Sequence, residues 1–447
     1  MPERVEVVIV GAGVAGLAAA KGLREHDVDV VVVEARDRIG GRILTQRDPA
    51  LAVPIELGAE FVHGSAPEFK EVIAEARLLS YDIEGRRYQV RRSRLAPLND
   101  FYKQLDLVMR RLDGERHTDR SFLEFLASAP GGRALAEQRR LALQYVEGFH
   151  AADPALISER ALADGGSPRG DAREMRMGRI LGGLDAVPAW LASGLTDRVR
   201  LSTSVTAVIW DERSVRLELR RGDGAQADDI EARAAVVTVP LGVLRASADE
   251  PGAIRFTPAL AAKRRAIETL EMGSVVRVAL RMRERFWVSE RLAKRLGDES
   301  LDRLNFVHGE DADFPVWWST YPVHSPLLVG WQGGVRAKRV AERGAGEITG
   351  AAIRALSGIF RMPRRKIEGM IEGMWTHDWE HDPHTRGAYS YARVGGADSS
   401  GRLAQPLRGT LFFAGEASDP GGRNGTVHGA IATGRRAAKQ VRRALGL

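Results

Sequence analysis

A strand, a glycine-rich turn and a helix open this chain, and they constrain its fold more than any other segment does. Residues 5–10 read VEVVIV, an almost wholly apolar run that is typical of a buried parallel strand. The pattern G-x-G-x-x-G follows at Gly11, Gly13 and Gly16 and leads into a helical pattern. A second apolar strand ends in Glu34. The segment therefore predicts a βαβ unit of the Rossmann type.

Each part of this unit has a physical task in holding a dinucleotide. Gly11 permits a tight turn, Gly13 lets a pyrophosphate approach the backbone, and Gly16 lets the helix pack closely on the strand. The N-terminus of the helix offers unpaired N–H groups to the phosphates. Glu34 can accept hydrogen bonds from both hydroxyls of an adenosine ribose. A βαβ turn that binds nothing is disfavoured, because all the parts are in register.

The residues that follow Glu34 read ARDRIGGR. They place Arg36, Gly41 and Arg42, two cations and one flexible backbone position, where a bound dinucleotide would extend. From these residues alone, both NAD and FAD remain open.

The rest of the chain alternates between helical and strand patterns. Residues 81–163 are predicted to be mostly helical, and further strands are predicted at 201–208, 215–220, 235–239, 274–282 and 410–414. A final helix is predicted to begin near Thr426. This closing strand and helix enclose a second glycine-rich loop, but its glycines lack the G-x-G-x-x-G register. We therefore do not expect a second dinucleotide site there.

Composition excludes several kinds of chemistry. The 447 residues favour two domains, or one domain with a large insertion. The absence of cysteine excludes disulfides, thiolate metal ligands, cysteine nucleophiles and a flavin tethered through sulfur. The ten histidines show no metal-ligand spacing, so we predict no metal.

The net charge of +7 is spread along the chain as scattered arginines, and no nucleic-acid motif accompanies them. A solvated basic surface is the favoured interpretation, and neither nucleic acid nor membrane is predicted as a partner. No stretch reaches the ~20 apolar residues that cross a bilayer. The first strand begins by Val5 and leaves no room for a signal peptide, so we expect a soluble cytoplasmic protein.

Several separate motifs resemble the FAD-containing amine oxidases, which include monoamine oxidases, polyamine oxidases and flavin-type histone demethylases. The first two are EARDRIGGR at residues 34–42 and IELGAEFVHG at residues 55–64. The later motifs, in order, are LGGLDAVPAWLASGL, VVTVPLGVL, MGSVVRVAL, RGAYSY and FFAGEASDPGGRNGTVHGA. The resemblance covers nearly the whole chain and favours the polyamine oxidase branch.

The resemblance implies an α/β fold with two domains and non-covalent FAD between them. Residues 1–75, 177–258 and 386–447 would form a discontinuous Rossmann-like FAD-binding domain. Residues 76–176 and 259–385 would form a substrate domain, a mixed β-sheet flanked by helices. The protein would be a monomer or a homodimer.

The resemblance also implies the cofactor contacts, which fall at the ADP half, near the isoalloxazine ring, at the adenine and along the ribityl chain. These positions are Gly11, Gly13, Ala15, Gly16, Glu34, Ala35, Arg36, Gly41, Arg42, Gly58, Ala59, Glu60, Phe61, Val205, Trp379, Gly415, Glu416, Thr426 and Val427.

For the chemistry, the resemblance implies hydride transfer from the α-carbon of an amine to flavin N5, hydrolysis of the imine, and reduction of O₂ to H₂O₂. Tyr389 matches one wall of the aromatic cage that aligns the amine. Thr426 stands where monoamine oxidases carry a second tyrosine, which favours polyamine-like or secondary amines. His63 matches a polar position that binds a substrate nitrogen.

Arg277 departs from the family pattern, which usually has a lysine that holds a water near flavin N5. A guanidinium keeps the positive charge but is weakly hydrated and does not deprotonate. Alternatives therefore stay open: an amine dehydrogenase that uses another acceptor, an FAD-binding redox sensor without turnover, and a desaturase or isomerase. An amino-acid substrate is less favoured, because no arginine and proline follow the LGA segment. A histone demethylase is less favoured because the chain lacks its extra helical segments.

Overall fold

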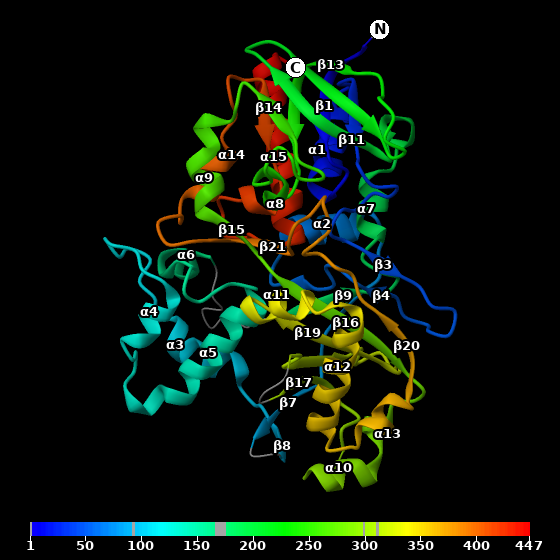
Figure 1. Ribbon diagram of the computed structural model, residues 1–447, viewed down its shortest axis with the longest axis vertical. Coiled ribbons are helices and arrows are strands. Elements are labelled where there is room, and N and C mark those ends of the chain that lie inside the picture. Colours follow the sequence, from blue (N-terminus) through cyan, green and yellow to red (C-terminus); the bar gives the residue numbers. More distant parts are fainter. Residues whose placement is uncertain (1, 92–93, 166–175, 298–299, 310–312) are drawn as a thin grey trace.

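The computed structural model of the chain describes residues 2–91, 94–165, 176–297, 300–309 and 313–447. Two large sheets, one above the other in Figure 1, organise these residues. The upper sheet has eight strands and contains the segment that opened the sequence. The lower sheet has seven strands and is built from the middle of the chain. The fold is thus α/β, as predicted.

The eight-stranded sheet has the order β10-β2-β1-β13-β12-β11-β14, with β22 also paired to β13. Strand β1 (Glu3–Val10) lies parallel to both β2 (Val30–Val33) and β13 (Ile230–Val237). All of β2 and the second half of β1 are buried, which explains their unbroken apolar runs. The remaining strands are β10 (Val199–Arg200), β11 (Thr203–Trp210), β12 (Val215–Arg221), β14 (Arg255–Thr257) and β22 (Leu411–Phe413).

Two helices from opposite ends of the sequence pack together against this sheet. Helix α1 (Val14–Arg24) and helix α15 (Val427–Leu445) contribute to one apolar core with β1 and β2. Gly434 lets the two backbones approach, because a Cβ there would lie 2.2 Å from the Ala15 carbonyl oxygen. The beginning and the end of the described chain therefore lie together, at the top of Figure 1.

The seven-stranded sheet has the order β20-β16-β19-β18-β17-β7-β8. On β16 (Val275–Met282), Val276, Val278 and Leu280 join the core that helix α12 (Gly344–Phe360) covers. Residues between them, such as Arg277, point to the opposite face. The other strands are β7 (Arg86–Arg91), β8 (Arg94–Pro97), β17 (Leu304–His308), β18 (Val316–Ser319), β19 (Leu327–Gly333) and β20 (Ile371–Trp375). The other helices near this sheet are α10 (Glu290–Leu296), α11 (Val335–Ala341) and α13 (Arg364–Glu368).

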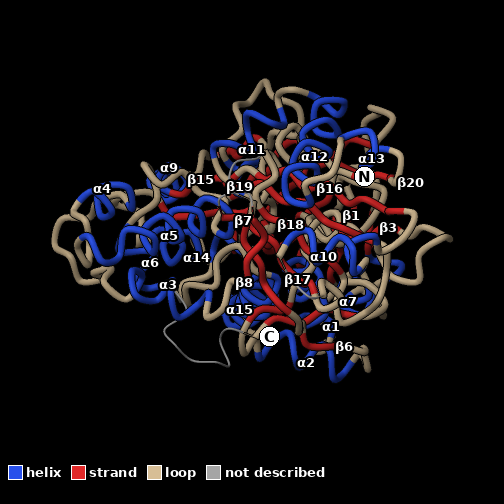
Figure 2. Tube along the Cα trace, turned by 90° about the horizontal axis from the view of Figure 1, so that it is seen from below, coloured by secondary structure: helices blue, strands red, loops and turns tan. Residues whose placement is uncertain are grey.

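The helical prediction for residues 81–163 is wrong at its start and right for much of the remainder. Strands β6 (Ser80–Asp82), β7 and β8 form there instead, because β7 pairs with β17 more than two hundred positions later and β6 pairs with β9 (Met177–Ile180). Tertiary pairing overrides a weak local preference there. Figure 2 shows the helices that follow gathered to one side of the sheets. They are α3 (Phe101–Met109), α4 (Phe122–Ala127), α5 (Ala136–Phe149) and α6 (Glu159–Asp164).

The other predicted strands are present with shifted bounds, and the largest shift is in β13, which begins at Ile230. The predicted segment 76–176 includes residues 166–175, which lie outside the described residues. The short connecting strands are β3 (Thr45–Gln46), β4 (Ile55–Glu56), β5 (Val62–His63), β9 (Met177–Ile180), β15 (Leu270–Gly273) and β21 (Tyr389–Ala392). The short connecting helices are α2 (Pro67–Glu75), α7 (Ala186–Leu191), α8 (Leu241–Leu244), α9 (Arg264–Thr269) and α14 (Ser399–Ala404).

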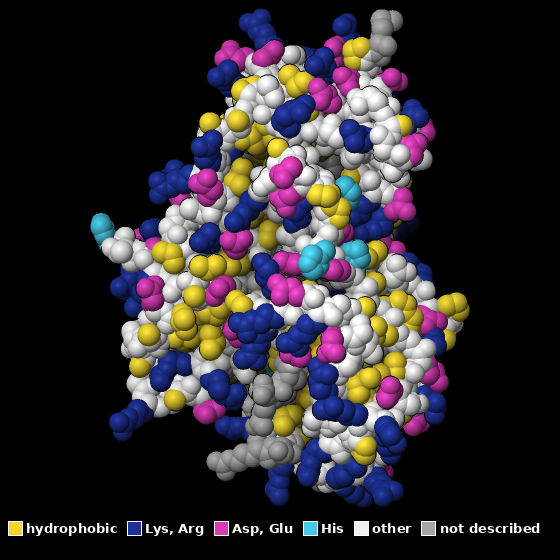
Figure 3. Space-filling model, viewed as in Figure 1, with side chains coloured by type: hydrophobic (Ala, Val, Ile, Leu, Met, Phe, Trp, Pro, Cys, Tyr) yellow, Lys and Arg dark blue, Asp and Glu magenta, His cyan; other side chains and the backbone are white. Residues whose placement is uncertain are grey.

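Charge is mixed over the surface. On the face drawn in Figure 3, lysine and arginine side chains lie among aspartate and glutamate across both halves of the molecule. Among the described residues, no helix is both long and apolar enough to cross a bilayer. The same residues contain no group of three histidine, aspartate or glutamate side chains that could hold a metal ion.

Candidate active site

A cavity of about 1230 Å³ runs from the glycine turn of the upper sheet to the inner face of the lower sheet. Gly11, Gly13 and Glu34 line one end, and Phe101 and Tyr145 line the other. Nearly every residue predicted for the site lines this one cavity. Gly16 is the exception: a Cβ there would lie 1.9 Å from the Gly11 carbonyl oxygen. Its task is the close packing that the pattern predicts.

The glycine-turn end fits a dinucleotide. A Cβ added at Gly13 would meet no atom of the described residues within 4 Å, so the backbone there is open. Gly13 is the N-cap residue that precedes helix α1, and no described side chain caps that end by a hydrogen bond. The first N–H groups of the helix are thus available to a phosphate. Glu34 is buried beside the turn and accepts hydrogen bonds from the backbone N–H groups of Ala12 (2.8 Å) and Arg36 (2.9 Å).

Arg36 is held by a distant segment. Its Nη2 donates to Asp382 Oδ1 and to Thr385 Oγ1, both at 2.7 Å. The side chain is therefore fixed at the edge of the cavity beside Glu34, with an Nη1–Oε1 distance of 3.9 Å between them. The sequence pattern locates Arg36 but does not identify the partners that position it.

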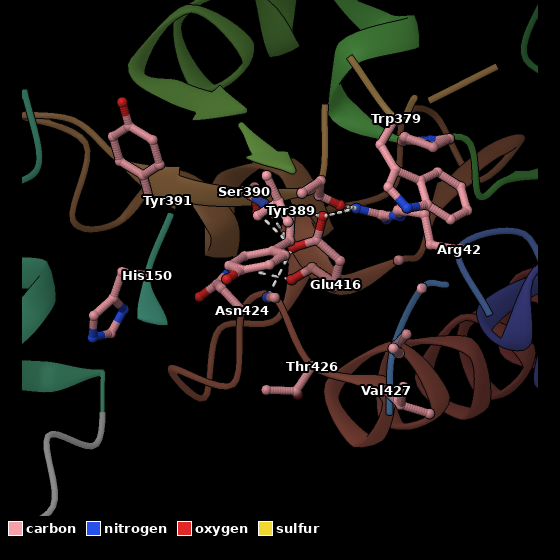
Figure 4. A pocket seen from close by; sticks show the side chains of 18 of the residues that line it. Arg42, His150, Trp379, Tyr389, Ser390, Tyr391, Glu416, Asn424, Thr426 and Val427 are labelled. Carbon is pink, nitrogen blue, oxygen red and sulfur yellow. Dashed lines mark hydrogen bonds and ion pairs between the residues drawn. The ribbon is translucent and has the colours of Figure 1, made fainter. Parts of the chain in front are cut away.

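Glu416 is the polar centre of the middle of the cavity (Figure 4). Arg42 Nη1 donates to its carboxylate at 2.7 Å, and so do Ser390 Oγ at 2.6 Å and the Gly425 N–H at 2.9 Å. Burial raises the pKa of the Glu416 carboxyl, but Arg42 and these hydrogen bonds bring it below its ordinary value. An ionised Glu416 therefore joins three segments of the chain around the cavity: its own loop, the segment of Arg42 and the segment of Ser390.

The loop just before helix α15 also lines the cavity. Thr426 caps this helix, because its Oγ1 accepts from the Gly429 N–H at 3.0 Å. Val427 follows as the first helical residue, and both line the cavity beside Gly415. The positive end of the helix thus points toward the site, as the sequence predicts.

A buried charge cluster underlies the loop of Gly58 to Phe61. Arg277 donates from Nη2 to Glu60 and from Nη1 to the Gly58 carbonyl oxygen at 2.9 Å. Arg179 donates from Nε to the other Glu60 oxygen at 2.5 Å, and Trp318 Nε1 lies 3.1 Å from the carboxylate. Arg277 therefore faces a glutamate, which the sequence interpretation did not foresee. Nothing in the local pattern marks Arg179 or Trp318 as members of this cluster.

Tyr389, Trp379 and His63 also line the cavity. Tyr389 donates from its hydroxyl to the Phe149 carbonyl oxygen at 2.7 Å, which fixes its ring against helix α5. Trp379 is buried and donates from Nε1 to the Leu57 carbonyl oxygen at 2.9 Å. Burial lowers the pKa of His63 to about 4, with a smaller contribution from His428, so the imidazole is neutral near pH 7.

Aromatic rings that the sequence interpretation did not select line the far half of the cavity. They come from the helices after β8 and from the seven-stranded sheet, and the helical pattern around residue 101 could have indicated some of them. They include Phe101, Tyr102, Tyr145, Phe149, Phe306, Trp318 and Trp331. The cavity is thus polar at the dinucleotide end and aromatic at the other.

A family model described as flavin-containing amine oxidoreductase matches residues 14–442. The chain belongs to this family. The amine oxidoreductase is accordingly an FAD-dependent enzyme that acts on amines, and the resemblance seen in the sequence is confirmed.

Curated relatives of the amine oxidoreductase include polyamine oxidase 2 of Arabidopsis thaliana, which is 27% identical over 98% of this chain and 88% of the relative. Lysine-specific histone demethylase 2 of Homo sapiens is 26% identical over 97% of this chain and 53% of the relative.

Among solved structures, putrescine oxidase bound to putrescine has a TM-score of 0.80 and 22% identity, and the match covers 99% of both chains. Cyclohexylamine oxidase from Brevibacterium oxydans IH-35A has a TM-score of 0.80 and 23% identity, covering 99% of this chain and 100% of that one. The two structures share the fold of this amine oxidoreductase.

Proposed function

We propose that this enzyme oxidises an amine by hydride transfer from the α-carbon to N5 of FAD, that water hydrolyses the imine, and that O₂ is reduced to H₂O₂. The favoured substrate is a polyamine-like or secondary amine. The observation that carries the proposal is the single cavity, which joins a dinucleotide end at Glu34 to an aromatic end beside Tyr389.

The residues of the chain would bind and orient the amine and exclude water from it. An amine must be neutral to lose a hydride from its α-carbon, because an ammonium has no lone pair to stabilise the iminium. The neutral His63 can accept a hydrogen bond from an ammonium and help to keep the amine deprotonated. The ring of Tyr389, fixed by its bond to Phe149, supplies one wall against which the amine can lie.

Two observations support a polyamine-like substrate. The first four curated relatives are polyamine oxidases, at 26–27% identity. Thr426, at the position where the resemblance expects a second tyrosine in monoamine oxidases, lines the cavity without a ring and would leave room for a substituted nitrogen.

A screen of amines tests the proposal. The FAD-loaded enzyme is mixed without oxygen with spermine, spermidine, their N-acetyl derivatives, putrescine and aromatic amines, and the loss of oxidised-flavin absorbance is followed. We expect at least one amine to bleach the flavin, and peroxide to form once air is admitted. Failure of every amine to reduce the flavin would contradict the proposal and favour a redox sensor without turnover.

The ion pair of Arg277 with Glu60 favours a second candidate, an amine dehydrogenase. An arginine held by a carboxylate is a poor substitute for a hydrated lysine in assisting the reaction with O₂. The same screen with an artificial electron acceptor separates the two functions. Turnover with the acceptor but not with O₂ would support the dehydrogenase.

A further inference from the structure

Arg87 enters the aromatic half of the cavity from strand β7. Its Cζ lies 4.2 Å from the centroid of the Phe306 ring, 5.1 Å from that of Phe101 and 5.3 Å from that of Tyr102. The Tyr102 hydroxyl, 3.4 Å from Nη2, is a weak partner for a group with five N–H donors. Most N–H donors of Arg87 therefore lie among aromatic rings.

The other arginines that line the cavity around the predicted flavin position have carboxylate partners. Arg36 pairs with Asp382 and Arg42 with Glu416, each at 2.7 Å, and Arg277 pairs with Glu60. By contrast, no carboxylate oxygen of the described residues lies within 4.0 Å of Arg87. Arg87 is partly buried, and charges that are removed from water are normally paired because an unpaired one is unfavourable. Among the described residues, Arg87 thus lacks the counter-charge that the arginines nearer the predicted flavin position have.

Two described neighbours of Arg87, His308 and Tyr145, carry no negative charge that could pair with it. Burial lowers the pKa of His308 to about 3, and Arg87 adds to the shift, so this imidazole is neutral. Burial raises the pKa of the Tyr145 phenol well above its ordinary value, so that group is uncharged as well. His308 stacks on the Phe101 ring at 5.4 Å and 19°. Its Nε2 is buried and finds no hydrogen-bond partner among residues that the structure describes.

Arg87 is within reach of a ligand that lies beside the flavin loop. The ring of Phe306, which Arg87 covers, lies 6.3 Å from that of Phe61 between centroids. Phe61 belongs to the loop predicted to pass the isoalloxazine ring, so one ring separates Arg87 from that loop. An amine held there could place its other end at Arg87 with only a short carbon chain between them.

We propose that Arg87, assisted by His308, binds a carboxylate at the end of the substrate remote from the amine that is oxidised. The proposal rests on the proposed amine oxidation, but it takes the secondary-amine alternative rather than the polyamine-like one and narrows that substrate to an amino carboxylate. The planar fork of the guanidinium matches a carboxylate in a bidentate manner, and the surrounding rings exclude the water that would compete. A second ammonium at this position would be repelled, so free diamines become the poorer substrates.

Three amines of similar length test the proposal: 4-aminobutanoate, n-butylamine and putrescine, whose far ends are anionic, neutral and cationic. Each is also used as its N-methyl derivative, since secondary amines are within the proposed function. We expect kcat/KM to fall in that order for the unaltered enzyme. In Arg87→Met, kcat/KM for 4-aminobutanoate should fall by roughly 10- to 100-fold, with about threefold change or less for n-butylamine. Arg87→Lys should recover part of the loss.

Arg94→Met is the matched control, because Arg94 lies on the neighbouring strand β8 with an exposed side chain. It removes the same charge outside the cavity and should leave the order of the three amines unchanged. Equal losses for all three amines in Arg87→Met would overturn the proposal and leave Arg87 a packing role. A preference of the unaltered enzyme for putrescine over 4-aminobutanoate would also overturn it.

A binding measurement tests the carboxylate site at Arg87 independently of the proposed amine oxidation. Butanoate has no amine to oxidise, and its dissociation constant with the FAD-loaded enzyme is measured by calorimetry. Binding that weakens by roughly tenfold or more in Arg87→Met, but not in Arg94→Met, would support the carboxylate site even if no amine reduced the flavin. Binding that is unaffected by Arg87→Met would overturn it.

Discussion

Arg277 and Glu60 form an ion pair inside the protein, although they lie 217 positions apart in the sequence. Glu60 also accepts a hydrogen bond from Arg179, so one carboxylate serves two guanidinium groups. Burial raises the pKa of Glu60, but the two arginines outweigh that effect and hold it below its ordinary value. The cluster keeps one net positive charge beneath the loop predicted to pass the flavin.

The first prediction concerns the stability of this cluster. Glu60→Gln removes the only charge that compensates the two buried arginines in the described part of the cluster, so we expect a loss of about 3–5 kcal/mol in unfolding free energy. Denaturant titration of the FAD-loaded protein measures it. Glu212→Gln is the control, because the Glu212–Arg408 pair is exposed and should contribute about 0–1 kcal/mol. A cost for Glu60→Gln as small as the control would contradict the assignment.

Arg277 should affect the reaction with oxygen more than the reaction with the amine. In Arg277→Lys, a compact and strongly hydrated ammonium replaces a guanidinium, and we expect reoxidation by O₂ to accelerate by about tenfold. Reduction by amine should change by about threefold or less. Stopped-flow measurement of the two half-reactions separates these rates. Arg281→Lys, on the same strand but paired with Asp48, should change neither, and unchanged reoxidation in Arg277→Lys would refute the role.

Tyr389 should act through its ring rather than its hydroxyl. Tyr389→Phe loses the hydrogen bond to Phe149, which is expected to cost about 1 kcal/mol of stability and little activity. Tyr389→Ala removes the wall itself and should lower kcat/KM for the amine by about 100-fold through lost orientation. Steady-state assays with equal FAD content compare the two variants. Equal loss of activity in both would show instead that the hydroxyl is essential.

Glu56 should make the stability of the fold depend on pH. Burial raises the pKa of its carboxyl to about 7, although Thr45 and the Leu184 N–H donate to it. The folded state therefore holds this proton more tightly than the unfolded state does. The stability that the carboxyl contributes is full below its ordinary pKa and is lost as the pH rises to about 7.

The amide introduced by Glu56→Gln cannot ionise, so this variant should not lose that stability as the pH rises. Relative to the unaltered protein, its unfolding free energy should rise by about 3 kcal/mol between pH 4.5 and pH 7, since each pKa unit corresponds to about 1.4 kcal/mol. Other titrating groups cancel in the difference between the two proteins. A difference that stays constant over this range would contradict the raised pKa.

Local features of the site could be predicted and distant pairings could not. Gly11, Gly13 and Glu34 act within one βαβ unit, so their spacing alone locates them. The partnership of Arg42 with Glu416 joins residues 374 positions apart, and no local pattern encodes it. Whether an arginine faces water or the cavity depends on strand register, as for Arg87 on β7.

Strands β6 and β7 show the same limit, because they pair with β9 and β17, which no neighbouring residue reveals. Other predictions concern a bound ligand, a domain boundary or the surroundings of the protein, and no contact within the chain tests them. The role of each site residue, the domain boundaries, the oligomeric state and the cytoplasmic location stay predictions.

The insertion of β22 beside β13 has a consequence for how the enzyme is made. Ribosomal synthesis delivers the glycine turn several hundred residues before the Glu416 loop. Until residues 411–447 emerge, Arg42 has no Glu416 to pair with and helix α1 has no α15 to pack against. The complete site therefore forms only after residues 411–447 have been made, and a nascent chain that stalls before β22 would lack the Glu416 side of the site.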